Sequence, residues 1–89
     1  MKHRYLEVTF RRGKALAAYL YLPRKPGAVV ASTVDAGQGM RVDYDPNGTP
    51  MGIEITAPMA VGVDDVNAIL RGLGQPELPS EEWAPLRAA

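Results

Sequence analysis

An α+β fold is predicted: an antiparallel β-meander of about five strands, covered on one face by one main C-terminal helix and followed by a short tail helix. Apolar and polar residues alternate along much of residues 1–57, as is typical of strands with one buried face. From residue 58 onwards, apolar residues recur at helical spacing. A length of 89 residues indicates a single domain, with the meander in residues 1–57 and the helical tail in residues 58–89.

The first two strands are predicted over residues 4–10 and 14–22, joined by a three-residue loop that ends in glycine. This loop would place Phe10 opposite Lys14. The second strand carries no charge after Lys14, which favours a central place in the sheet, although its alanines and leucines also suit a helix. One of its faces is aliphatic and consists of Leu16, Ala18, Leu20 and Leu22.

A proline-containing linker at residues 23–27 leads to a third strand over residues 28–34, which is rich in β-branched side chains. The central hairpin follows, and its Asp-Pro-Asn-Gly sequence at residues 45–48 suits a type I turn. Both strands can bury their apolar residues on one face only if the hairpin has a four-residue loop or a bulge. Arg41 then lies opposite or diagonal to Glu54 on the polar face.

The central hairpin also carries a resemblance. Asp-Tyr-Asp-Pro-Asn-Gly at residues 43–48, followed by Gly-Ile-Glu-Ile at residues 52–55, resembles a small bacterial family of unknown function with an Asp-Tyr-Asp-x-x-Gly turn and a Gly-Ile-Glu-Ile strand. Residues 17–22 loosely match an upstream strand of that family, so the resemblance covers roughly residues 5–57. Family members often have an acidic residue shortly before the tyrosine, where this chain has Leu16, so any role of that acid is missing here. The resemblance implies a fold but no assigned activity, and some members look like partners of small toxin-like proteins.

The main helix is predicted near residues 65–73. Asp64 or Asp65 can cap its start, and Gly72 or Gly74 can end it. Its apolar residues follow at helical spacing and are Val66, Ile69, Leu70 and Leu73.

Ser80 is predicted to cap the short tail helix. Trp83, the single tryptophan, would lose burial energy in water. We therefore expect Trp83 to be buried against the sheet, either of its own subunit or of a second one.

Composition restricts the class of protein. Hydrophobic residues make up 46% of the chain and charged residues 22%, which is ordinary for a globular domain. The absence of cysteine excludes disulfides and thiolate metal sites, and a cytoplasmic location is the expectation. No apolar run approaches the roughly 20 residues that cross a membrane, and no signal peptide is recognised, so a membrane partner is not expected.

Charge is distributed unevenly although its total is zero. Residues 1–27 hold seven basic residues and one acid, whereas residues 28–89 hold three basic residues and nine acids. The favoured interpretation is that charged turns keep the strands soluble. Nucleic-acid binding through the basic N-terminal half is the alternative. Its predicted contacts are Arg11, Arg12, Lys14, Arg24 and Lys25.

Residues that could carry chemistry are few. His3 is the only histidine, and nothing in the sequence supplies a group that would hold it as a base. Asp43, Asp45 and Glu54 could bind a hard cation, but a turn role for Asp45 and a solvated strand face for the other two are favoured. We therefore predict no catalytic residue, no metal site and no cofactor, and a protein that is not an enzyme.

The best candidate for function is an aromatic face. Tyr5, Tyr19 and Tyr21 are predicted to share, with Ala15 and Ala17, the sheet face opposite the helix. Aromatic residues are enriched at protein interfaces, although this face could equally pack under the C-terminal tail. The hypothesis is a small non-enzymatic protein-binding or dimerisation module. It would be homodimeric and antitoxin-like, with a small toxin-like protein as its partner. The predicted partner-binding residues are Tyr5, Tyr19, Tyr21 and Trp83.

Overall fold

A computed structural model describes residues 3–87 of the chain. It contains five strands, a short 3-10 turn and two helices, measures 37 × 24 × 24 Å and confirms the α+β class. The elements are β1 (Tyr5–Arg11), β2 (Lys14–Tyr21), β3 (Ser32–Gly37), β4 (Met40–Tyr44), β5 (Pro50–Ile55), η1 (Pro58–Ala60), α1 (Val63–Gly72) and α2 (Ser80–Arg87).

The sheet is antiparallel throughout, with the strand order β1-β2-β5-β4-β3. The central place predicted for β2 is confirmed. The last three strands form a meander whose final strand lies beside β2, which is the order of a Greek key. Residues 22–31 make the long connection that this order requires, and they cross to the far edge of the sheet. The third strand therefore begins at Ser32 and not at residue 28 as predicted.

The hairpin between β1 and β2 differs from its prediction. Arg12 and Gly13 have φ angles of 54° and 78° and form a two-residue turn, which pairs Arg11 with Lys14. A bulge then compensates for the shorter turn, because Phe10 pairs with Ala15 while the next pair skips Leu16. On the turn side of the bulge the predicted faces are exchanged, so Ala15 joins the core and Leu16 is 53% exposed, whereas Ala18, Leu20 and Leu22 lie in the core as predicted.

Of the two alternatives predicted for the central hairpin, a four-residue loop or a bulge, the structure has the bulge. Asp43 pairs with Gly52 and the next pair joins Tyr44 to Pro50, so one extra residue lies in β5. Arg41 lies opposite Glu54, as the sequence predicts.

Asp45 has the turn role predicted for it. Its Oδ1 accepts hydrogen bonds from the backbone N–H groups of Asn47 at 2.8 Å and Thr49 at 2.9 Å. The carboxylate is therefore used to hold the loop of the central hairpin.

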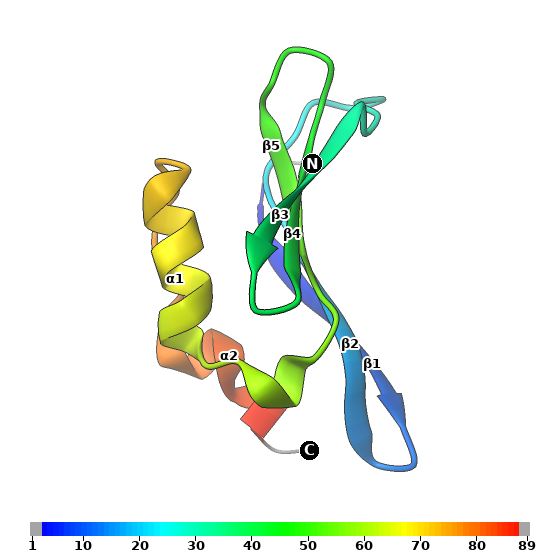
Figure 1. Cartoon of the computed structure of the whole chain (residues 1–89), viewed down its shortest axis with the longest axis vertical. Coiled ribbons are helices and arrows are strands. Elements are labelled where there is room, and N and C mark those ends of the chain that lie inside the picture. Colours follow the sequence, from blue (N-terminus) through cyan, green and yellow to red (C-terminus); the bar gives the residue numbers. More distant parts are fainter. Residues whose placement is uncertain (1–2, 88–89) are drawn as a thin grey trace.

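Both helices pack on one face of the sheet (Figure 1). The helix α1 begins at Val63 after an extended Gly62, so the predicted cap at Asp64 or Asp65 is corrected. Asp65 instead accepts a hydrogen bond at 2.8 Å from the N–H of Gly62. The most deeply buried residues lie between the sheet and α1 and include Leu20, Ile53, Ile55, Val66 and Leu70.

The tail is tied into the same core. Trp83 is 2% exposed, which confirms its predicted burial and places it within its own chain. The side chain of Asn67, on α1, accepts a hydrogen bond from the N–H of Leu78 at 2.6 Å and donates one to the Leu78 carbonyl at 3.1 Å. Arg4 donates hydrogen bonds to the carbonyls of Pro76 and Glu77.

Over residues 3–87, no helix combines the length and apolarity needed to cross a membrane.

Candidate functional site

The face of the sheet that points away from α1 and α2 is the candidate site, and we call it the outer face. Its side chains form two rows that run across all five strands. One row consists of Tyr5, Tyr21, Gly52, Asp43 and Thr33. The other row consists of Glu7, Tyr19, Glu54, Arg41 and Asp35.

The tyrosines of the outer face form one aromatic cluster. Tyr5 and Tyr21 are paired across β1 and β2, and their rings stack with centroids 4.4 Å apart and planes inclined by 15°. Tyr19 meets Tyr21 edge to face, with ring centroids 4.7 Å apart. Both arrangements are the favourable geometries for aromatic pairs, so each ring restrains the next.

Arg24 extends this cluster from the connection after β2. Its guanidinium carbon lies 5.2 Å from the centroid of the Tyr21 ring, within the range of a cation–π interaction. The same guanidinium donates hydrogen bonds to the carbonyls of Leu22 and Met51. These bonds hold the cation in place over the ring. The partner-binding prediction from the sequence did not include Arg24, because nothing in a proline-rich linker indicates where its side chain turns.

Tyr19, Asp43 and Thr33 form a polar network that crosses from β2 to β3. The Tyr19 hydroxyl donates to Asp43 Oδ2 at 2.7 Å, and the Thr33 hydroxyl donates to Asp43 Oδ1 at 2.6 Å. Asp43 is only 9% exposed, so the predicted solvated position of this carboxylate is wrong. The two hydroxyl groups replace water around the carboxylate.

Gly52 makes this network possible. The ring of Tyr19 crosses directly above Gly52, where a β-carbon would lie 2.3 Å from the ring. A glycine within a strand often marks such a close approach. Gly52 and Asp43 both belong to the hairpin motif noted in the sequence, and Tyr19 belongs to the upstream strand. The three residues thus form one packed unit, and the mid-strand glycine was the signal in the sequence that could have predicted it.

The tyrosine hydroxyls act as hydrogen-bond donors. Burial, then the hydrogen bond and negative charge of Asp43, raise the pKa of Tyr19 to about 12, against a smaller opposing effect of Arg24. The pKa of Tyr21 is also raised, by desolvation first and then by the charge of Glu7, whose carboxylate lies 3.3 Å from the hydroxyl. Both phenols therefore stay protonated at neutral pH and fit recognition rather than nucleophilic chemistry.

The carboxylates of the outer face are not arranged around a cation. Within residues 3–87, no group of three or more His, Asp or Glu side chains is placed to hold a metal ion. Both oxygens of Asp43 accept hydrogen bonds from hydroxyl groups, and Asp45 holds its own turn. His3 is exposed.

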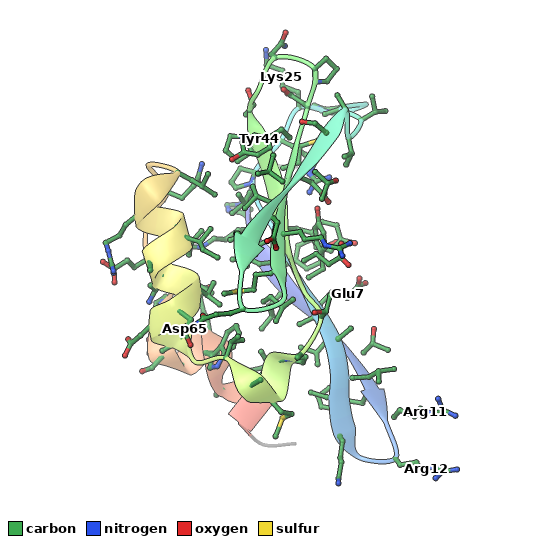
Figure 2. The ribbon with its side chains drawn as sticks, in the orientation of Figure 1. Glu7, Arg11, Arg12, Lys25, Tyr44 and Asp65 are labelled. Carbon is green, nitrogen blue, oxygen red and sulfur yellow. The ribbon has the colours of Figure 1, made fainter. Side chains whose placement is uncertain are left out.

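The remaining predicted residues lie elsewhere. Arg11 and Arg12 lie at the free end of the first hairpin, whereas Lys25 lies at the opposite end of the molecule (Figure 2). Trp83 belongs to the core on the helix side of the sheet, away from the tyrosines. The structure therefore brings together Tyr5, Tyr19 and Tyr21 and separates them from Trp83.

The outer face is acidic overall. Its two rows carry the carboxylates of Glu7, Asp35, Asp43 and Glu54 against the guanidinium of Arg41, and Arg24 adds one further positive charge at the edge of the cluster.

Comparisons with protein families, with characterised proteins and with solved structures found no match to this chain.

Proposed function

We propose that the protein is a small non-enzymatic protein-binding module and that the outer face, centred on Tyr21, is its contact surface. One observation carries this proposal: Tyr5 and Tyr19 both pack on Tyr21, on a sheet face that α1 and α2 leave uncovered. Tyr5 is 49% exposed although it stacks on Tyr21, so the cluster presents aromatic surface to a partner.

The restraint of these rings supports binding. Association costs about 0.5–1.5 kcal/mol for each flexible side chain that becomes immobilised. Tyr19 and Tyr21 are already held by ring contacts and hydrogen bonds, so much of that cost is met before a partner arrives. Tyrosine also offers both a large apolar ring and a polar tip, which is why paratopes use it heavily.

The charge of the outer face indicates the chemistry of the partner. Four carboxylates against two guanidinium groups repel phosphate and attract a basic protein surface. We propose a partner whose contact surface is basic, and a small toxin-like protein, as the family resemblance implies, fits this description. The module is also proposed to be homodimeric.

Nucleic-acid binding is less well supported. Arg11, Arg12 and Lys14 lie at one end of a 37 Å molecule and Lys25 at the other, with an acidic face between them. Arg24 is engaged with Tyr21 and two backbone carbonyls. Salt-sensitive binding of fluorescent DNA or RNA oligomers at about 50 mM salt would instead favour this alternative.

The test uses the product of the neighbouring gene, co-expressed with the tagged protein. We expect the two to purify together, and Tyr5→Ala with Tyr21→Ala to weaken their complex by about 2 kcal/mol or more in calorimetry. Val34→Ala is the matched control, because Val34 is 52% exposed but pairs with the core residue Val42 and so points to the other side of the sheet. Equal affinity of the tyrosine variant and the control for that product would contradict the proposal.

A further inference from the structure

The free end of the β1–β2 hairpin combines apolar and basic side chains. It extends beyond the helices at one end of the molecule (Figure 1). Phe10 is 49% exposed and Leu16 is 53% exposed, and Met59 of η1, which lines the same hollow as Leu16, is 61% exposed. Three basic residues line that hollow with Leu16 and Met59, namely Arg11, Arg12 and Lys14. We call this set of six residues the hairpin end.

An open hollow of about 490 Å³ lies at the hairpin end. Ala15, Leu16 and Met59 provide its apolar lining, and the three basic residues lie around it. In the part of the chain that the structure describes, no carboxylate forms an ion pair with these three cations. An occupant with both negative charge and apolar surface would complement the hollow.

The helix α2 carries a surface of this kind. Its buried residues, Trp83 and Leu86, face the core, whereas its exposed residues are Ser80, Glu81, Glu82, Ala84 and Pro85. Two carboxylates and two small apolar side chains therefore point to solvent on one short helix. This composition complements the basic rim and the apolar lining of the hairpin end.

The positions of the two surfaces allow a symmetric arrangement. Met59 lines the hollow of the hairpin end, and it also lines a second hollow with Trp83 and Leu86 of α2. The helix α2, whose solvent side carries the acidic surface, thus lies beside η1 near the end of the molecule where the hairpin projects (Figure 1). A two-fold axis near Met59 would bring each surface of one chain against the other surface of a second chain, as an isologous interface requires.

We propose that the protein forms a two-fold homodimer in which the hairpin end of each protomer docks on the acidic surface of α2 in the other. This assignment goes beyond the proposed function, because it uses a different surface and leaves both outer faces open to the basic partner. Two acidic outer faces would also repel each other if they met in a dimer.

Other occupants fit the hairpin end less well. A nucleic acid would neutralise the cations but would leave Leu16 and Met59 against water, because the lining of the hollow itself has no aromatic ring on which a base could stack and Phe10 lies outside that lining. A bilayer surface is flat and would span the hollow instead of filling it. Both serve as outcomes of the test.

The first experiment measures mass by light scattering at micromolar concentration. We expect about twice 9.6 kDa at about 50 mM salt, with dissociation favoured at about 500 mM salt because charged pairs are screened. Arg11→Glu with Arg12→Glu should weaken the dimer at least about tenfold. Lys25→Glu, a charge reversal at the opposite end of the molecule, should leave it unchanged. A monomeric wild-type chain, or a dimer unaffected by the double reversal, overturns the proposal.

The second experiment restores the pairing with exchanged charges. Glu81→Arg with Glu82→Arg should also favour the monomer. Mixing this variant with the Arg11→Glu, Arg12→Glu variant should give a mixed dimer, because one of its two contacts keeps the native charges and the other has both charges exchanged. Blue-shifted emission from Trp83 confirms that each variant is folded. If no mixed species forms although both variants are folded, the proposal fails.

The third experiment separates this dimer from the proposed function. Tyr5→Ala with Tyr21→Ala should leave the dimer intact. If that variant dissociates the dimer while the hairpin variants do not, the second copy lies on the outer face and the present inference is wrong, although the outer face remains a binding surface. If anionic phosphatidylglycerol vesicles or DNA oligomers bind a monomeric wild type through Arg11 and Arg12, the occupant is different and the dimer is overturned.

Discussion

The ring of Tyr19 crosses Gly52 so closely that a β-carbon there would lie 2.3 Å from it. Gly52→Ala should therefore displace the ring and break its hydrogen bond to Asp43. We expect a loss of about 2–3 kcal/mol in the free energy of unfolding, measured by urea denaturation.

The same substitution has an internal control. In a Tyr19→Ala background no ring lies above residue 52, so Gly52→Ala should then be neutral or slightly stabilising, because alanine suits a strand better than glycine does. Additive effects of the two substitutions would show that the close contact does not determine the cost.

Ionisation of Tyr19 provides a pH-dependent test. Its pKa is raised from 10.0 to about 12 in the folded protein, so the folded state keeps a proton that the unfolded state loses. The stabilisation is fully present below pH 10 and should be lost as the pH rises towards 12. Urea denaturation across this window should show falling stability, and Tyr19→Phe should make the fall smaller. An equal fall in both proteins would contradict the assigned pKa.

The tyrosines of the outer face follow from the alternation in β2, whereas their polar partners do not. Period-two spacing places Tyr19 and Tyr21 on one face regardless of the neighbouring strand. The burial of Asp43 depends on Tyr19 and Thr33, which come from β2 and β3 and reach it across the sheet. Such contacts depend on the order and register of the strands. The alternation of residues within one strand gives neither the order nor the register.

The tail depends on a single side chain of α1. Asn67 pairs with both backbone groups of Leu78 and is 6% exposed. Asn67→Ala leaves these buried groups unpaired, so we expect a loss of about 2–4 kcal/mol in the free energy of unfolding. Trp83 emission should also shift to longer wavelength as the tail loosens. Asn47→Ala, in an exposed turn, is the matched control and should change stability by less than about 0.5 kcal/mol.

Strands and helices were predictable where periodicity is long and regular. The bulge in the central hairpin was predictable because both of its strands have a clear apolar face. The three-residue loop predicted for the first hairpin is wrong, because Arg12 adopts a φ of 54°, a conformation that arginine rarely takes. The resulting two-residue turn needs a bulge at Leu16 to restore the core face. A turn of this type is normally signalled by asparagine or glycine at both positions.

The domain as a whole needs its tail. Leu78, Trp83 and Leu86 each lie in the core and are at most 3% exposed. Removing residues 75–89 should therefore abolish cooperative thermal unfolding and increase the binding of a hydrophobic dye. Glu81→Gln with Glu82→Gln changes only exposed side chains of the tail and should keep a cooperative transition. A truncated chain that still unfolds cooperatively would show that the meander is stable without the tail.

The order of the strands also has a consequence for synthesis. Residues 18–21 of β2 emerge from a ribosome before residues 52–55 of β5, with which they pair. Until then β2 has only β1 beside it, and Leu20 and Leu22 have no core to enter. Pairing between such distant segments also slows folding, because a long loop must close first. A nascent chain therefore exposes the aliphatic side of its central strand until β5 and the helices have left the ribosome, and during that interval it is a natural client for a chaperone that binds apolar segments.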